Sequence, residues 1–329
     1  MSQSLLYRDC PVCDQNAARP HWQKGELHIV RCDNCRMIYV NPVPGEMATG
    51  QFYDDAGKDY YLSPDKLESD YADVRFEREL RLFRKYCPRG SVLDVGCSSG
   101  AFLFQLRQRW PADYKILGTD ASGPPLDYAE SRGVPVGRGN FLERDFSIPG
   151  GAPVSGPARS RNENPPAGSE TGAPFDAITF WAVIEHLAEP KKFLEQAHSL
   201  LKPGGLCFVL VPNVGSLATR LLGRRYRYVY AQHLNYFSET TLGQLAAAVD
   251  YQLVTTRVMH FNPVVIWQDL RGGGREVSNV ERAQLLKRTT AYKQSLAMKP
   301  IRLVYTGTEK LLGALKLADN LAVVLRKPG

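Results

Sequence analysis

The chain has no long apolar run and only a small excess of charge. No stretch of about 18 apolar residues is present, which disfavours a transmembrane helix. The segment before the first cysteine lacks an apolar core of signal-peptide length, so we expect a cytoplasmic protein. Lys plus Arg number 41 and Asp plus Glu 34, a net charge of +7. This excess permits an acidic partner such as RNA, a nucleotide-linked substrate or an anionic lipid surface, and requires none of them.

Cysteine is scarce, and its placement is uneven. Of the 7 cysteines, four form two C-x-x-C pairs and the others are scattered. An odd total with such pairs, in a chain that we do not expect to be secreted, favours a metal site over a disulfide framework. Two pairs at this spacing are typical of a structural zinc site with four thiolates, and buried or redox-active pairs are the alternative. The expected zinc ligands are Cys10, Cys13, Cys32 and Cys35.

From Ser91 onwards, strand-like and helix-like segments alternate. Short apolar runs and Gly-containing turns separated by amphipathic segments predict an α/β fold, a doubly wound sheet with helices on both faces. Residues 146–174 are rich in Gly, Pro, Ser and Asn and predict a flexible loop. A helical insertion at 262–319 separates the last two strands. The expected strands are Ser91–Gly96, Lys115–Thr119, Val134–Gly137, Ala177–Trp181, Leu206–Val211, Gln252–Met259 and Asn320–Arg326.

A Gly-containing turn follows the first of these strands, in SVLDVGCSSGAFLFQL. Gly96 and Gly100 allow the backbone to approach a ligand closely, and the next helix offers free N–H groups. The G-x-G-x-x-G order of a dinucleotide site is missing, and Asp94 suits a cationic amino group better than a pyrophosphate. Asp120 ends the next strand, where a carboxylate can accept both hydroxyls of a ribose. For Asp120 taken alone, a helix cap or turn is the alternative.

These motifs, in this order, resemble those of class I S-adenosylmethionine-dependent methyltransferases. The matching runs are VLDVGCSSGAFL, GTDAS, GNFLE, FDAITFWAVIEHLAEPKKFL and LKPGG, within about Ser91–Val211. The resemblance implies a seven-stranded Rossmann-like sheet whose last strand is antiparallel. It also implies S-adenosylmethionine as the cofactor. The implied cofactor contacts are Asp94, Gly96, Cys97, Gly100, Asp120, Ala121, Asn140, Phe141 and Trp181.

The resemblance assigns each contact to a part of the cofactor. Asp94 and the Gly96–Gly100 loop would surround the methionine part, and Asp120 would bind the ribose. Asn140 and its neighbour would lie beside the adenine. The sequence departs from the family at two places, because Ser98 stands where a second glycine is common and Asn140 where an Asp often reads the adenine amino group. An Asn can still face the adenine edge.

The chain begins with a C-P-x-C…C-x-x-C segment, followed by YVNPVP, a Tyr-rich stretch and then the methyltransferase-like region. This wider layout resembles methyltransferases of sugar, polysaccharide or antibiotic biosynthesis. It implies a zinc ribbon at 1–45, a helical linker or cap at 46–88 and a methyltransferase domain at 89–329. Within the cap, Pro64–Tyr86 has a helical pattern. The expected acceptor is a small molecule, namely a sugar, a nucleotide-sugar, or a lipid-linked or other natural-product intermediate.

Two other functions remain as alternatives. Ribosomal-RNA methyltransferases also join a zinc ribbon to this fold, and the chain is basic. Against nucleic acid, the charge excess is small, and FWAV stands where amino-methylating nucleic-acid enzymes carry an NPPF/Y-type tetrapeptide. The other alternative is a non-catalytic scaffold, which the intact Asp94, Gly96, Gly100 and Asp120 disfavour.

Catalytic groups are expected after the fourth and fifth strands, which border the cofactor. Glu185 and His186 follow the fourth strand and resemble part of the E-x-x-E-H run that quinone-biosynthesis O-methyltransferases use for a divalent ion. Ala182 replaces the first Glu, so we predict no catalytic metal. His186 is a candidate base, or it organises the loop. His233, in AQHLNYFS, is a second candidate base or orienting group, with a structural role as the alternative.

Two basic segments could bind anionic groups. Arg224, Arg225 and Arg227 alternate with tyrosines and either bind a phosphate of the acceptor or form a solvated loop. Over 299–316, apolar residues recur at helical spacing among lysines and arginines. This segment either packs on its own domain or lies on an anionic membrane surface, which would make the protein peripheral to the membrane and its acceptor lipid-linked.

Overall fold

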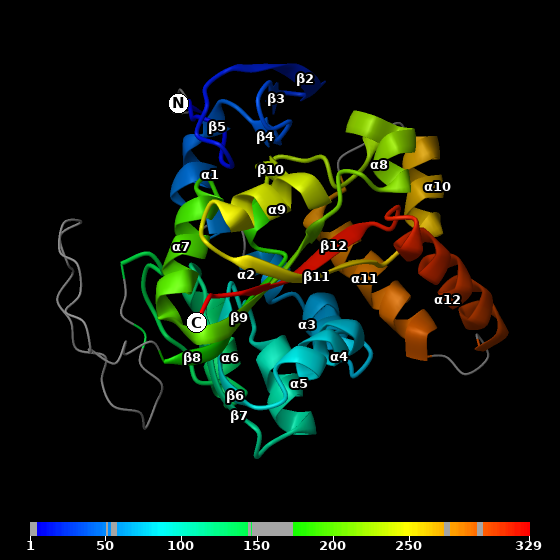
Figure 1. The fold of residues 1–329 in the computed structure, drawn as a ribbon. Helices are drawn as coiled ribbons and strands as arrows, with labels where there is room; N and C mark the ends of the chain where they lie inside the picture. Colours follow the sequence, from blue (N-terminus) through cyan, green and yellow to red (C-terminus); the bar gives the residue numbers. More distant parts are fainter. Residues whose placement is uncertain are drawn as a thin grey trace, which may run out of the picture.

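The computed structural model describes residues 5–50, 52–53, 58–143, 146, 174–272, 277–294 and 299–329. Its centre is a sheet with the strand order β11-β12-β9-β8-β6-β7 (Figure 1). Strands β7, β6, β8 and β9 are parallel, and β12 is antiparallel to both of its neighbours. The α/β fold and its antiparallel last strand are therefore confirmed. The strands are β6 (Gly90–Val95), β7 (Tyr114–Thr119), β8 (Phe175–Trp181), β9 (Leu201–Pro212), β11 (Gln252–Met259) and β12 (Asn320–Arg326).

The strand expected over 134–137 is reduced to a single bridge. Val136 pairs in parallel with Gly118 of β7, at the position of a seventh strand. Two backbone hydrogen bonds hold it there, because the Gly118 N–H donates to the Pro135 carbonyl (2.9 Å) and the Gly137 N–H to the Gly118 carbonyl (2.7 Å). Most of the loop predicted at 146–174 lies outside the described residues.

Helices cover both faces of the sheet because strand residues alternate between two cores. In β9, Cys207, Val209 and Val211 belong to one core, whereas Phe208 and Leu210 belong to the other. This burial on both faces explains why parallel strands have continuous apolar sequences. The first core includes α7 (Pro190–Leu200) and α9 (Glu239–Ala247), and the second includes α4 (Glu77–Tyr86), α5 (Ala101–Arg109) and α6 (Gly123–Ser131).

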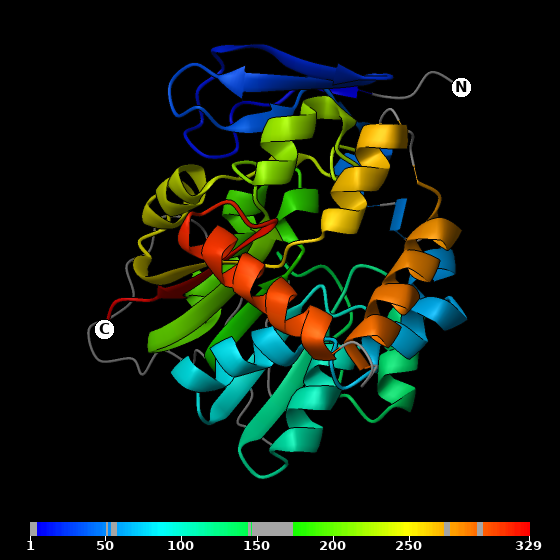
Figure 2. The same cartoon turned by 90° about the vertical axis from the view of Figure 1, so that its right-hand side faces the viewer.

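The N-terminal segment forms a small antiparallel sheet that takes one strand from the middle of the chain. Strands β2, β3 and β4 are joined by β10, in which Asn235 lies opposite Tyr39. Figure 2 shows this sheet across one end of the molecule. Met37 and Tyr39 are fully buried in the same core as the central sheet. The elements are β1 (Leu5–Leu6), β2 (Ala18–Lys24), β3 (Leu27–Cys32), β4 (Ile38–Val40), β5 (Val43–Pro44), α1 (Gly45–Thr49) and β10 (Asn235–Tyr236).

Arg8 ties this N-terminal sheet to the rest of the protein. Its guanidinium donates to the backbone carbonyls of Ala188 (2.6 Å) and Leu234 (2.8 Å). It also donates to the Val40 carbonyl and to Oδ1 of Asn235. One side chain therefore satisfies acceptors from the ribbon, from the loop after β8 and from the start of β10.

The helix expected over 64–86 is broken at 71–76, into α3 (Pro64–Asp70) and α4. Gln105 of α5 donates from Nε2 to the carbonyl oxygens of Asp70 and Ala72, at 3.0 Å each. A side chain from another helix thus satisfies backbone groups that the break leaves without intrahelical partners.

The described residues between β11 and β12 form three helices. α11 packs on α3, where Lys287 pairs with Asp65 at 2.9 Å. In α12, Leu312 is buried whereas Leu311 is exposed, so the helix packs on its own protein along one side. Leu315, in the turn after the helix, is exposed as well. No helix in the described part of the chain is both long and apolar enough to cross a membrane. The remaining helices are α2 (Lys58–Tyr61), α8 (Leu217–Leu222), α10 (Pro263–Gly272), α11 (Asn279–Gln294), α12 (Lys299–Ala314) and the 3₁₀ turns η2 (Ile184–His186) and η3 (Gly223–Arg225).

Replacing Arg8 by Ala should strongly destabilise the fold. The substitution leaves the partly buried acceptors of Ala188, Leu234 and Asn235 without their donor. We expect the free energy of unfolding in urea to fall by about 3 kcal/mol. Arg19→Ala is the control, because its exposed pair with Asp33 should contribute less than about 1 kcal/mol. Equal losses in the two variants would contradict the bridging role of Arg8.

Candidate functional site

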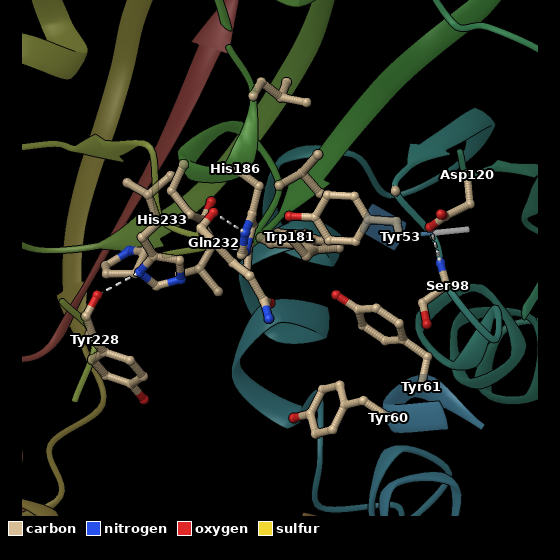
Figure 3. A pocket seen from close by; sticks show the side chains of 18 of the residues that line it. Tyr53, Tyr60, Tyr61, Ser98, Asp120, Trp181, His186, Tyr228, Gln232 and His233 are labelled. Carbon is tan, nitrogen blue, oxygen red and sulfur yellow. Dashed lines mark hydrogen bonds and ion pairs between the residues drawn. The ribbon is translucent and has the colours of Figure 1, made fainter. Parts of the chain in front are cut away.

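A cavity of about 1380 Å³ opens at the carboxyl ends of β6, β7, β8 and β9. One part is lined by the turns after β6 and β7, and another by the cap, the loop after β8 and the late insertion. Figure 3 shows Asp120 and Ser98 at one end and His233 and Tyr228 at the other, with His186 between them. In open α/β sheets, ligands bind at this edge.

The turn after β6 has the geometry of a close ligand approach. Gly96 and Gly100 have φ of 71° and 75°, in the left-handed region that favours glycine. A Cβ at Gly96 would lie 2.6 Å from a methyl carbon of Val183, so a larger residue does not fit. The Cys97 side chain packs back against β7, where its sulfur would lie 2.7 Å from a Cβ at Gly118. Only the backbone of Cys97 is therefore suited to contact a ligand.

Asp120 is oriented by two backbone N–H groups. The Ser98 N–H donates to one carboxylate oxygen at 2.8 Å, and the Ser122 N–H donates to the other at 3.1 Å. Ser98 adopts φ of 50°, which explains why related turns favour glycine at this position. Each oxygen of a carboxylate has more than one acceptor position, so both can also accept from a diol. Ala121 follows Asp120 at the cavity wall.

Asp94 is almost completely buried at the end of β6. Thr179 of β8 donates its hydroxyl to Asp94 Oδ1 at 2.6 Å. Burial raises the pKa of Asp94 to about 7, the Thr179 hydrogen bond opposes that rise, and the charge of Asp120 adds to it. A buried carboxyl with so high a pKa becomes a strong partner for a cation that enters the cavity.

Asn140 and Phe141, expected beside the adenine, already have partners within the protein, whereas the indole N–H of Trp181 has none among the described residues. Asn140 accepts from the Leu142 N–H at 3.1 Å and donates to Glu143 at 2.8 Å, so its amide is engaged within its own turn. Phe141 is buried and stacks on Phe193, with centroids 5.4 Å apart. Trp181 lines the cavity, and its buried indole N–H has no partner within the described residues.

His186 and His233 lie together in the cavity, with ring centroids 4.8 Å apart. The Nδ1 atoms lie 2.8 Å from the carbonyl oxygens of Gln232 and Tyr228, respectively. Since a carbonyl can only accept, each Nδ1 carries the proton and each Nε2 keeps its lone pair. Burial lowers the pKa of His186 to about 4 and that of His233 well below its usual value. Both imidazoles are therefore neutral proton acceptors at physiological pH.

Glu185 lies beside this pair and is fully buried. Neither carboxylate oxygen has a hydrogen-bond partner among the described residues, and Oε1 lies 3.9 Å from Nε2 of His186. Burial raises the pKa of Glu185 to about 8. The ligand atoms of Glu185, His186 and His233 lie within 4.8 Å of one another, a set able to hold a divalent cation. The sequence indicated only the first two of these residues as neighbours.

Strand β10 fixes the two histidine-bearing loops relative to each other. The Leu234 N–H donates to the Glu185 carbonyl at 2.8 Å. Asn235 donates from Nδ2 to the carbonyls of Ile184 (3.0 Å) and Leu187 (2.7 Å). Because β10 is also the fourth strand of the ribbon sheet, the ribbon takes part in positioning His186 and His233.

Sequence reasoning missed several residues of the cavity, including three tyrosines and one arginine that matter for its chemistry. Tyr53, Tyr60 and Tyr61 come from the cap, and Arg282 comes from α11. The Tyr53 ring stands edge-on to His186 with centroids 6.0 Å apart (Figure 3). The Tyr-rich stretch was visible in the sequence, but nothing in its spacing placed it at the cavity. Arg282 gave no signal in the sequence, because it is one of several cations on an ordinary helix.

The sequence left two interpretations open for the arginine cluster, a phosphate site and a solvated loop, and the cluster does not converge on the cavity. Arg227 is paired with Asp269 at 2.6 Å. Arg224 and Arg225 are exposed and line a separate hollow beside β2, and Tyr226, which follows them, is buried. The solvated-loop interpretation therefore describes Arg224 and Arg225, and Arg227 is engaged in an ion pair.

The four N-terminal cysteine sulfurs lie within 4.8 Å of one another. The Cys10–Cys35 and Cys13–Cys32 sulfur distances are 3.4 and 3.5 Å. The edge of a tetrahedral zinc–thiolate site, with Zn–S of about 2.3 Å, is about 3.8 Å. The two C-x-x-C turns have matching geometry, because the residue after each pair has a positive φ and donates its N–H to the first cysteine of that pair.

The chain is similar to several known methyltransferases. A family model described as a methyltransferase domain matches residues 70–256. The ubiquinone biosynthesis O-methyltransferase of Ruegeria pomeroyi is 29% identical over 54% of this chain and 66% of its own length. Its counterpart from Chelativorans sp. is 31% identical over 41% of this chain and 46% of its own length. The matches thus span about half to two thirds of these relatives.

Among solved structures, the phosphoethanolamine N-methyltransferase 2 of Haemonchus contortus, in complex with S-adenosyl-L-methionine, has the same fold. Its TM-score is 0.50 at 16% identity, covering 89% of this chain and 63% of that one. The chain therefore belongs to the class I S-adenosylmethionine-dependent methyltransferases.

If Asp94 contacts the amino group of S-adenosylmethionine, as the sequence predicts, binding of this cofactor should weaken as the pH falls below 7. Asp94 has a pKa of about 7 in the free protein, whereas the amino group of the ligand stays protonated below this pH. We expect the dissociation constant to rise by up to about tenfold per pH unit, since binding must first deprotonate Asp94. Calorimetry from pH 5.5 to 8 measures this. Asp94→Asn should bind weakly and without this pH dependence, and a pH-independent wild type would contradict the assignment.

Proposed function

We propose that the protein transfers a methyl group from S-adenosylmethionine to a hydroxyl oxygen of a small molecule. The observation that carries this proposal is one continuous cavity, which joins the Gly96–Gly100 turn to two neutral imidazoles. The acceptor oxygen attacks the sulfonium methyl carbon, the carbon–sulfur bond breaks, and its electron pair stays on sulfur. Alignment of donor and acceptor supplies much of the rate. The name O-methyltransferase of the relatives supports oxygen as the accepting atom.

We assign each residue of the cofactor site to a part of S-adenosylmethionine by its charge and hydrogen-bonding capacity. Asp94 pairs with the amino group, because a buried carboxyl favours a cation. Asp120 accepts the ribose hydroxyls. The turn from Gly96 to Gly100, with the backbone of Cys97, surrounds the methionine part, and Trp181 flanks the transferred methyl group. Asn140 can face the adenine only after it releases Glu143, so its contribution to binding is small.

His186 is the proposed proton acceptor. Of the two imidazoles it lies nearer to Asp120 and Ser98, and its Nε2 has the free lone pair (Figure 3). When Nε2 takes the hydroxyl proton, the imidazolium lies 3.9 Å from Glu185. Glu185 is mostly protonated at neutral pH, but the positive charge on His186 favours its ionised form, and the resulting carboxylate stabilises the imidazolium. His233 is the proposed orienting group, packed against the ring of His186.

For the N-terminal sulfurs, we propose one structural zinc ion bound by Cys10, Cys13, Cys32 and Cys35. Four thiolates close a tetrahedron and leave no position for a substrate. The function of the metal is then to fix the turns that precede β2 and follow β3. Because β3 pairs with β4 and β4 pairs with β10, fixing these turns also helps to fix the position of β10 and of the loops that carry His186 and His233.

An RNA acceptor is the alternative that the ribbon suggested. The ribbon sheet uses its β4 edge to pair with β10, and Met37 and Tyr39 are buried. This engagement favours an internal structural role for the ribbon over a recognition surface. A non-catalytic scaffold is disfavoured by the intact cofactor turn and by the imidazole pair.

Methyl-labelled S-adenosylmethionine and host-cell extract provide the first test. We expect label in the organic-soluble or small aqueous fraction. Label in RNA would contradict the proposal and make the ribbon a recognition surface. If no fraction is labelled, a cofactor-binding titration decides, because absence of binding would favour the scaffold.

Replacing His186 by Gln should lower kcat by about 10²–10⁴-fold, because the proton acceptor is lost. The dissociation constant of S-adenosylmethionine should change by less than about twofold, as the substitution lies outside the proposed cofactor contacts. His198→Gln is the matched control, since His198 lies on α7 away from the cavity. An unchanged kcat in His186→Gln would exclude His186 as the base.

Purified protein should contain one zinc ion per chain. Cys32→Ser should lower both the zinc content and the unfolding temperature, because metal binding contributes directly to folding. Cys87→Ser, at a cysteine far from the cluster in sequence, should keep its zinc. Metal analysis by mass spectrometry measures both variants. A zinc content near zero in the wild type would contradict the zinc assignment.

A further inference from the structure

Arg282 of α11 enters the part of the cavity that faces the histidines. Its guanidinium carbon lies 5.0 Å from the ring centroid of Tyr60 and 4.7 Å from that of Tyr230. Its Nη2 donates to the Tyr230 hydroxyl at 2.9 Å. Two aromatic rings and one hydrogen bond therefore fix the orientation of this cation, as is common at cation–π sites.

Arg282 differs from its charged neighbours in the cavity. Lys66 and Arg75 both pair with Asp70. Arg227 pairs with Asp269. Arg282, in contrast, has no carboxylate partner within the described ranges of the chain. A partly buried guanidinium without a counter-charge is costly, and a bound anion would remove that cost.

The surroundings of Arg282 are otherwise neutral. The pKa values of His186 and His233 are lowered, chiefly by burial, so both rings are uncharged. Burial raises the pKa of Tyr230, and this phenol stays protonated. Glu185, with a pKa of about 8, is mostly protonated at neutral pH. The positive charge of Arg282 is thus unopposed at the acceptor side.

Aromatic rings in contact with one another lead from Arg282 to His186, the proposed base. The centroid of Tyr230 lies 4.3 Å from that of His233, which lies 4.8 Å from that of His186. Asp120 and Ser98 lie beyond His186, at the opposite end of the cavity from His233 (Figure 3). Arg282 therefore neighbours the space for the acceptor, and the carboxylate of the cofactor has its place near the turn after β6.

We propose that Arg282 selects acceptors that carry an oxyanion, a carboxylate or a phosphate, besides the hydroxyl that is methylated. The inference rests on the proposed function, since it takes the histidine side of the cavity as the acceptor site. A guanidinium binds either oxyanion with two parallel N–H donors. The tyrosine rings beside it favour a planar or ring-shaped acceptor body.

The test is a ligand-observed NMR titration of protein saturated with S-adenosylhomocysteine. The probes are benzoate and phenyl phosphate as anions, with benzyl alcohol as the neutral match. We expect at least one anion to bind about tenfold more tightly than benzyl alcohol, and Arg282→Gln to abolish that preference. Arg288→Gln, on an exposed position of the same helix, is the matched control and should keep it.

The anion that loses affinity in Arg282→Gln identifies the oxyanion class. If neither anion binds wild type more tightly than benzyl alcohol, the proposal is wrong, and this comparison needs no folded variant. A preference that persists in Arg282→Gln also overturns it. Methyl transfer is not part of the readout, so this result is independent of the labelling experiment. Failure to bind S-adenosylhomocysteine would count against the proposed function instead.

Discussion

The pairing of β4 with β10 is the constraint on which the rest of the site depends. The Val40 N–H donates to the Leu234 carbonyl at 2.9 Å, and the Leu234 N–H donates to the Glu185 carbonyl at 2.8 Å. Arg8, from the ribbon, donates hydrogen bonds to the carbonyls of Ala188 and Leu234 in the same region. The cysteine-bearing sheet and the loop after β8 are thus one hydrogen-bonded unit. The orientation of His186 and His233 therefore depends on residues that are distant in sequence.

Exclusion of water determines the charges in the cavity. The same burial raises the pKa of Asp94 and of Glu185 and lowers that of His186. Asp94 and Glu185, which would be ionised at the surface, are therefore partly or mostly protonated here, and a ligand group of opposite charge restores their ionisation. Arg282 remains charged because a guanidinium keeps its proton even when partly buried. The two ends of the cavity consequently prefer ligand groups of opposite charge, a cation at Asp94 and an anion at Arg282.

Local sequence signals predicted the central sheet and the cofactor turn, because apolar runs and glycines act over a few residues. Strands β11 and β12 begin and end where the sequence placed them. The break at 71–76 was not predictable, since it depends on Gln105 from another helix. The acceptor side of the cavity could not be predicted for the same reason, because it is formed by contacts between segments that are distant in sequence. Arg282 reaches the cavity only because α11 packs on α3, and no spacing along the chain reveals such a contact.

Strand β12 lies between β9 and β11 but follows both of them in sequence. During synthesis on a ribosome, β9 and β11 are therefore available before the strand that joins them. The parallel half of the sheet, β7-β6-β8-β9, has its partners earlier and can form first. Until β12 inserts, β9 presents an unpaired edge of apolar residues, which is prone to association with other chains. Chaperone dependence should thus be greatest for chains that are truncated before residue 320.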